Sequence, residues 1–586
     1  MGYQEIVCQI CGVSANISRI RHSGEPRAHS WRSDGWAPIT NADYNFVNHS
    51  GGWSRGCRDC MTPDYRVPED DHDSDSDYVY ESDDIPEPYE YNTPRESDAE
   101  DTSEETGSTS GSLKGESTDS EYLKNSNYSS FIASLTDPPS IPQTGFRPLL
   151  DVVNEPMYSA RDCFHEHIAG PNCTHLSGYN GNRISVEEMR GCCTFQYLCP
   201  KPASWQPQSD DEAFETEKDF DFFLSGLTDH VTSRDEPYTD VFPPRHECRL
   251  PHGDNVFWSQ EEAAVTAMPF HPTCLEVYKR ASLFRFGKID IKALVDWYRL
   301  EADLTHFSRD FPRHEAVKRG NEQWWRHIRG DEWLAANPCF VPALPPIFER
   351  VKDFHPVERG YHREVFDVNR VQSRPMREYQ PGDVFARLSF ELRLEVLSYL
   401  GSRDIANLRL VTRVFRQLPQ SLFHQLLLRE APWLWETWCP LPYSCWAANS
   451  RSKLERVDKM LHEQQSDLEN WHMRVLSEGV STNENEAAIL ALRTKGTPRI
   501  QAMEEEVKQL YQPHDVPMLP RPGTNWYQLF LEITRQWGSL KGLRNRERIW
   551  ADCNYILDRI EAHRTAGRIG DGIVVDPVAT FLAYSR

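Results

Sequence analysis

The feature that most constrains the fold of this chain is a stretch of two amphipathic helices between residues 383 and 418. Apolar residues recur there at helical spacing, and Gly401-Ser402 ends one predicted helix and begins the next. Two short helices cannot bury both of their apolar faces alone, so the stretch must pack on the rest of the chain or bind a partner. The first apolar group is Leu392, Val396, Leu397 and Leu400, and the second is Ile405, Leu408, Val411 and Phe415.

The order of residues in this stretch resembles the F-box family over about forty residues. One position departs from the family pattern, which usually begins with Leu-Pro, because Leu388 is followed here by Ser389. Either residue can open a helix, since proline suits the first helical position and serine is a good N-cap. The resemblance rests on Leu388, Glu391-Leu392, Val396 to Leu400, Asp404-Ile405, Leu408-Arg409, Val411 and Arg413 to Arg416.

The resemblance implies a non-catalytic adaptor. F-box proteins dock on a Skp-type adaptor and through it on a cullin, as the substrate-recognition subunits of ubiquitin ligases. The remainder of the chain would then hold a protein substrate, which the sequence does not identify. An ordinary helical hairpin inside an all-α domain is the alternative interpretation. The residues implied to contact or support the adaptor are Leu388, Leu392, Val396, Leu397, Leu400, Ile405, Leu408, Val411 and Phe415.

The length of 586 residues predicts several domains, because single hydrophobic cores seldom grow beyond about 300 residues. We expect a mainly α, multidomain protein with a small Cys/His-rich α+β zinc-type unit at its N-terminus. The expected segments are a Cys-rich zinc-binding segment at 1–65, an acidic disordered linker at 66–130, a Cys/His-rich α+β region at 138–361, the F-box at 383–430 and a helical region for substrate or partner binding at 431–586.

The formal net charge of −25 is concentrated in one tract. Between Glu69 and Ser120 there are 19 acidic residues against two basic ones, with few aliphatic side chains, so the tract cannot offset the entropy of ordering. An acidic chain argues against nucleic acid or an anionic membrane as the main partner. The densest basic patch, residues 541–548, is interpreted as a solvated turn. No apolar run is long enough to span a bilayer and the start lacks a signal-peptide pattern, so we expect a cytoplasmic or nuclear protein.

Two C-x-x-C pairs near the start predict a structural zinc site. Cys8 with Cys11 and Cys57 with Cys60 can each present two thiolates from a tight turn, and together they would complete one tetrahedral site. In a reducing compartment the 15 cysteines are thiols or metal ligands rather than disulfides. Free cysteines are the alternative.

A second arrangement uses a pair much later in the chain. His271 and Cys274 open an amphipathic helix, and an H-x-x-C pair at a helix start can complete a zinc site with one of the N-terminal pairs. Spacing does not decide which of the intervening Cys163, Cys173, His175 and Cys192 join them.

A catalytic role finds little support in the motifs. The chain has no H-E-x-x-H helix, no Walker loop and no nucleophile elbow, and thiolate-rich zinc sites are usually closed and structural. Besides the adaptor, the sequence therefore allows a zinc-organised scaffold or regulatory protein that acts outside ubiquitin ligases.

Overall fold

The computed structural model describes residues 6–32, 58–65, 143–149, 166–201, 205–207, 211–229, 241–242, 256–257, 267–301, 311–321, 325–353, 383–415, 417–454 and 508–570, with single positions between 456 and 505. The chain divides into two compact units, Met1–Thr62 with Pro148–Arg586, and Pro63–Arg147. The predicted acidic linker at 66–130 lies outside the described residues. None of the described helices is both long and apolar enough to cross a membrane.

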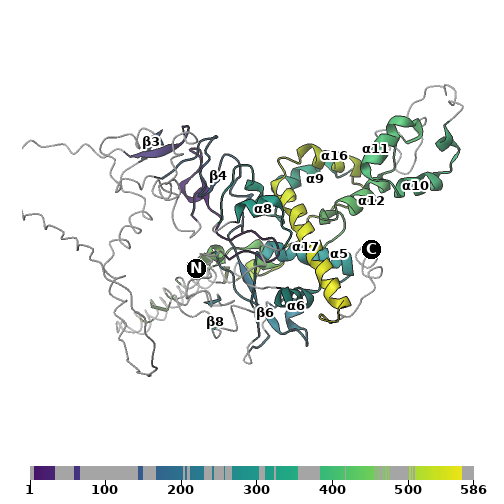
Figure 1. Cartoon of the computed structure of the whole chain (residues 1–586). Helices are drawn as coiled ribbons and strands as arrows, with labels where there is room; N and C mark the ends of the chain where they lie inside the picture. Colours follow the sequence, from purple (N-terminus) through teal and green to yellow (C-terminus); the bar gives the residue numbers. More distant parts are fainter. Residues whose placement is uncertain are drawn as a thin grey trace, which may run out of the picture. The chain divides into compact units, whose positions relative to one another are not determined.

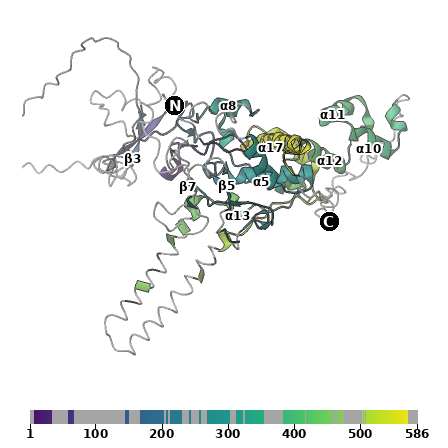
Figure 2. The same ribbon diagram turned by 60° about the horizontal axis from the view of Figure 1, so that its bottom comes forward.

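The first unit is partly helical with a few small sheets. Among its described helices, α5 (Pro272–Phe286) and α17 (Lys541–Thr565) lie side by side, as Figures 1 and 2 show. The helix α6 (Ile291–Glu301) also packs on α17. The other helices are α8 (Glu315–Gly320), α9 (Leu344–Val351), α10 (Phe390–Ser398), α11 (Ser402–Val411), α12 (Gln420–Glu430), α13 (Cys445–Ala448) and α16 (Trp526–Gln536), with short 3-10 turns η5 (Glu332–Ala335) and η7 (Val384–Arg387).

The described strands are short and form one three-stranded sheet and three two-stranded sheets. The three-stranded antiparallel sheet has the order β6 (Phe222–Leu224), β5 (Gln196–Pro200), β9 (Met268–Phe270). The strand β9 runs directly into His271, the N-cap of α5. The other pairs are the parallel β1 (Arg19–Ile20) with β4 (Tyr179–Asn180), β7 (Val241–Phe242) with β8 (Val256–Phe257), and β2 (Met61–Tyr65) with β3 (Gln143–Pro148).

The helix α17 lies at the centre of the main hydrophobic core. Its apolar stripe is buried at helical intervals, and the same core includes residues from Cys8 near the start of the chain to Ile569 near its end. The basic residues at the start of α17 are part of this packing. Arg546 is fully buried and Arg548 is 5% exposed, so the prediction of a solvated turn at 541–548 is wrong.

Arg546 is buried in a network of polar and aromatic contacts. Its guanidinium lies 2.8 Å from a carboxylate oxygen of the buried Glu436 and 3.8 Å from the ring centroid of Trp435. Its Nε donates a hydrogen bond of 2.6 Å to the carbonyl of Pro338. Such partners are what allow a charge to be buried, and they connect α17 to two distant loops.

His327 is a buried imidazole held in one orientation. Its Nε2 accepts a 3.0 Å hydrogen bond from the backbone N–H of Ser18, and its Nδ1 lies 2.9 Å from the carbonyl of Leu176. This arrangement requires the neutral tautomer with the proton on Nδ1. Burial lowers the pKa of His327 from 6.5 to about 4.

Acid is therefore expected to weaken the fold through His327. Below pH 6.5 the unfolded chain binds a proton at this position, whereas the folded chain does so only near pH 4. The stabilisation is complete above pH 6.5 and is lost as the pH falls towards 4, by up to about 3 kcal/mol. Denaturant titrations between pH 7 and 4 should show a steeper loss of stability for the native chain than for His327→Gln, whose amide can replace both hydrogen bonds. Parallel curves for the two proteins would contradict this assignment.

Candidate metal site and docking surface

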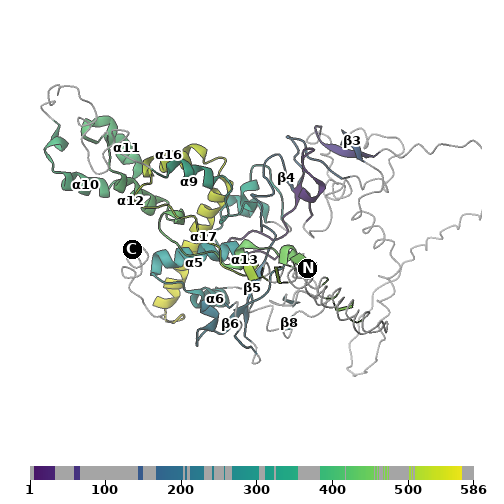
Figure 3. The same ribbon diagram turned by 180° about the vertical axis from the view of Figure 1, so that it is seen from behind.

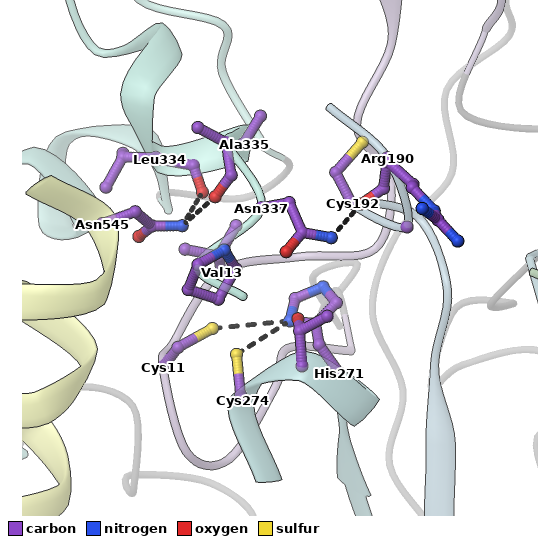
Figure 4. A pocket seen from close by; sticks show the side chains of 14 residues that line it. Cys11, Val13, Arg190, Cys192, His271, Cys274, Leu334, Ala335, Asn337 and Asn545 are labelled. Carbon is purple, nitrogen blue, oxygen red and sulfur yellow. Dashed lines mark hydrogen bonds between the residues drawn. The ribbon is translucent and has the colours of Figure 1, made fainter. Parts of the chain in front are cut away.

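Four of the predicted metal ligands meet at the N-terminus of α5. Cys8, Cys11, His271 and Cys274 are all buried, and their ligand atoms lie within 4.8 Å of one another. The Sγ atoms of Cys11 and Cys274 lie 3.5 and 3.7 Å from Nδ1 of His271 (Figure 4). A tetrahedral zinc ion separates its nitrogen and sulfur ligands by about 3.5 to 3.8 Å. The geometry fits such an ion, and it selects one of the pairings that the sequence left open.

The loop that carries Cys8 and Cys11 is shaped by a glycine and by hydrogen bonds to sulfur. The N–H of Gly12 donates to the carbonyl of Cys8 at 2.7 Å, and Gly12 has a φ of +73°, which disfavours other residues. The backbone N–H groups of Cys11 and His271 both donate to Sγ of Cys8 at 3.4 Å. These two donors hold the Cys8 side chain in place, with its sulfur facing the other members of the cluster.

Two arginines hold the outside of this loop. Arg313 donates to the carbonyls of Gln9 at 2.7 Å and Ile10 at 2.5 Å, and Arg548 donates to the carbonyl of Cys11 at 2.7 Å. A side chain at position 12 would come within 2.8 Å of Nε of Arg313. The N-terminal loop is thereby fixed to α17 and to the segment before α8.

Asp552 connects these two arginines. Its carboxylate lies 3.2 Å from each of Arg313 and Arg548, and all three side chains are buried. Burial raises the pKa of Asp552 to about 6, although both guanidinium groups lower it, so the carboxylate is mostly ionised at pH 7. The sequence interpretation missed this group. The spacing of Arg548 and Asp552, one helical turn apart, is the signal that could have revealed the pair.

Burial and the close contacts within the cluster shift the pKa values of its members. Burial alone raises the pKa of Cys11, but hydrogen bonds from Cys274 and Cys8 and the charge of His271 hold it well below its usual value. Burial lowers the pKa of His271, and the charges and hydrogen bonds of the neighbouring Cys11 and Cys8 sulfur groups outweigh this effect and raise it to about 10. The pKa of Cys274 is raised, by burial first. These shifts favour a thiolate at Cys11 beside a positive imidazole at His271, and a metal ion would replace the protons of the cluster.

The cluster borders a pocket that has no carboxylate among its lining residues. Figure 4 shows two of its amides facing the backbone rather than the sulfur atoms. Asn337 donates to the carbonyl of Arg190 at 2.7 Å, and Asn545 donates to the carbonyl of Ala336 at 2.7 Å. These polar groups hold the surrounding loops, as expected around a closed, structural metal site with four protein ligands.

Cys60, the described member of the second C-x-x-C pair, is placed elsewhere. Cys60 lies in a separate cluster with His167 and Cys173, so the two pairs do not share one cluster among the described residues. Cys57 and Cys163 lie outside those residues. Of the other intervening candidates, Cys192 lines the pocket beside the first cluster and His175 packs edge-on against His167.

The predicted helical hairpin is formed by α10 and α11. Ser389 is the N-cap of α10 and accepts a hydrogen bond from the N–H of Leu392, so serine opens this helix without the proline that the family usually has. Residues of α12 then hold the hairpin. Arg429 donates to the carbonyl of Ser398 at 2.6 Å, and the carboxylate of Glu430 accepts from the N–H of Ser402 at 2.8 Å.

The nine predicted adaptor-binding residues fall into three groups by exposure. Leu397, Ile405 and Phe415 are buried and form the core of the hairpin itself. Leu392 and Val411 are 53% and 81% exposed. The remaining four are half-buried, namely Leu388, Val396, Leu400 and Leu408.

Two further exposed apolar residues, missed by the sequence interpretation, lie at the same end of the hairpin. Val384 is 64% exposed and Leu410 is 87% exposed. The side chains of Asp383 and Thr412 hydrogen-bond at 2.5 Å, which brings the start of η7 to the end of α11. Arg393 donates to the carbonyl of Phe385 at 3.2 Å and so brings the start of α10 to the same place.

The exposed apolar residues at this end of the hairpin are together called the hairpin patch. It consists of Val384, Leu392, Leu410 and Val411.

Comparison with known proteins leaves the chain without a family assignment. No family model matches the sequence, and no solved structure matches the fold. A segment of 60 residues is 40% identical to the ATP-dependent RNA helicase mss116, mitochondrial, of Aspergillus oryzae. This segment is 10% of the chain and 9% of the helicase, so the similarity is confined to a short piece of each protein and shows neither a shared family nor a shared activity.

Proposed function

We propose that this protein is a non-catalytic adaptor whose helical hairpin docks on a Skp-type subunit of a cullin-based ubiquitin ligase, while the rest of the chain holds a protein substrate. The observation that carries the proposal is the hairpin patch. Large apolar side chains that gather on a surface and stay exposed usually mark a protein interface. Leu392 and Val411 belong both to this patch and to the positions of the F-box resemblance.

The connection between the hairpin and the body of the first unit supports this role. The helix α12 contacts α10 on one side and α16 on the other, and Figure 3 shows the three helices in this sequence of neighbours. The ring of Phe423 on α12 lies 4.8 Å from the ring of Tyr527 on α16. A continuous apolar core along this path would transmit a fixed orientation from a docked adaptor to a bound substrate.

In the proposed protein, the first metal cluster of Cys8, Cys11, His271 and Cys274 is a structural zinc site. Its three thiolates and one imidazole are the ligand set of closed zinc sites, and its position between the N-terminal loop, α5 and α17 would order the body of the protein. Zinc there would stabilise the fold and carry out no reaction.

The adaptor function is tested by co-purification with a Skp-type protein. Leu392→Asp/Val411→Asp is expected to lower recovery of the partner at least about 100-fold, because buried interface anchors contribute about 2 kcal/mol or more each. Both side chains are exposed, so the substitutions should leave the helical content and the thermal midpoint unchanged. Leu300→Asp, at a leucine of α6 that is 47% exposed, is the matched control and should retain the partner. Undiminished recovery by the double variant would refute the proposal.

A zinc-organised scaffold outside ubiquitin ligases is the second candidate, favoured by the buried Cys/His clusters. Recruitment of a cullin distinguishes the two candidate functions. A complex that contains the Skp-type protein and a cullin supports the ligase adaptor, whereas a Skp-type complex that never recruits cullin supports the scaffold.

A further inference from the structure

The cluster of Cys60, His167 and Cys173 has the features of a metal site in its own right. Sγ of Cys173 lies 3.4 Å from Nε2 of His167, and the three ligand atoms lie within 4.8 Å of one another. Their residues are only 1%, 0% and 4% exposed. Two thiols and an imidazole at this separation are the ligands of zinc rather than of calcium or magnesium, which prefer oxygen.

Backbone pairing fixes the two segments that supply these ligands. Met61 and Ile168 exchange two hydrogen bonds, of 3.0 and 2.8 Å, directly beside Cys60 and His167. The N–H of Leu149 donates to the carbonyl of Cys60 at 3.0 Å. Cys60 and His167 are therefore positioned by backbone pairing on the residues next to them.

The turn before Cys173 is built for close approach to Cys60. The N–H of Gly170 lies 3.5 Å from Sγ of Cys60, in position to donate to the sulfur, and the N–H of Cys173 closes the turn on the carbonyl of Gly170 at 3.1 Å. A Cβ at position 170 would lie 2.3 Å from the carbonyl oxygen of Asp59, so only glycine fits. The carboxylate of Asp59 accepts from the N–H of Asn172 at 2.9 Å and holds the turn in place.

We infer that Cys60, His167 and Cys173 bind a second zinc ion, separate from the ion at Cys8, Cys11, His271 and Cys274. The two ligand sets are nested along the chain. The inner cluster, Cys60, His167 and Cys173, lies in sequence between the two pairs that form the first, outer cluster. The inference is independent of the adaptor proposal. It rests on the three described ligands Cys60, His167 and Cys173.

Metal analysis of the full chain, purified in a reducing buffer, tests the inference. The native protein should contain two equivalents of zinc. Cys60→Ser/Cys173→Ser should contain one, while Cys439→Ser, at a buried cysteine outside both clusters, should contain two. One equivalent in the native protein, or an unchanged content in the double variant, overturns the inference. So does recovery of Cys60 and Cys173 as a disulfide in the native protein.

A second pair of variants separates ligation from general loss of folding. His167→Ala removes a ligand and should contain one equivalent, whereas His167→Cys supplies a thiolate in its place and should restore the second. The same loss in both variants would show that the imidazole only packs in the core, and would overturn the inference. Far-UV circular dichroism checks that all variants keep their helices.

Discussion

Removing the ligands of the first cluster is expected to unfold much of the first unit. Structural zinc contributes about 10 to 16 kcal/mol of apparent binding free energy in small domains, which is as large as the whole net stability of a typical protein. Cys11→Ser/Cys274→Ser should therefore lose about one equivalent of zinc and lack a cooperative thermal transition near that of the native chain. Near-UV circular dichroism of the 17 tryptophans reports the transition, and metal analysis reports the zinc.

The size of this effect follows from what meets at the cluster. The N-terminal loop is held to α17 by Arg548 and to the segment before α8 by Arg313, and the ligands hold it to α5. Without an ion, four polar side chains would remain buried together with no metal to coordinate, in a site from which water is excluded. The control is Cys439→Ser, which alters a buried thiol that lies in neither cluster. A double variant that melts with the native protein would show that the cluster does not stabilise the fold.

Arg546→Met is expected to destabilise the fold by about 3 to 5 kcal/mol, because it leaves the carboxylate of Glu436 buried without its cation. The guanidinium is fully buried, and its hydrogen bonds join α17 to the carbonyls of Pro338 and Trp433. Denaturant unfolding followed by tryptophan fluorescence measures the loss. Arg546 belongs to neither metal cluster, so the zinc content of Arg546→Met should remain that of the native chain.

Two further variants identify the cause of that loss. Arg546→Met combined with Glu436→Leu removes both charges and should recover much of the stability, since an apolar pair of similar volume can replace a buried ion pair. Arg559→Met removes a surface partner of Glu301 at 2.8 Å, and it should cost less than about 1 kcal/mol because Arg559 is 46% exposed at its side chain. Equal losses for Arg546→Met and Arg559→Met would contradict the argument.

Local spacing predicted the parts of the metal site but not their combination. The C-x-x-C and H-x-x-C patterns identify Cys8, Cys11, His271 and Cys274 as ligands because each pair lies within one turn of chain. That the first pair joins the last is decided by tertiary packing over a separation of 263 residues between Cys8 and His271. The partners of Cys60 were hidden for the same reason.

The hairpin shows a similar limit. Helical periodicity and the capping preference of serine were enough to predict α10, α11 and the role of Ser389. Periodicity could not tell that Leu397 would be buried and Leu392 exposed, because one apolar stripe serves both the hairpin core and the free surface. Arg546 was misjudged because a run of basic residues usually faces solvent, and its burial depends on Glu436, far away in the chain.

The nested order of the ligands sets an order of assembly during synthesis. Cys60 and Cys173 leave the ribosome about a hundred residues before His271, so the inner cluster can close first. Inner closure spans about 110 residues and outer closure 263, a difference of about 0.8 kcal/mol in loop-closure entropy for an open chain. Once the inner cluster is closed, the outer loop is effectively shorter. If the inner cluster binds the second zinc ion that we infer, a chain arrested before His271 would already hold this ion, while Cys8 and Cys11 would still lack their partners.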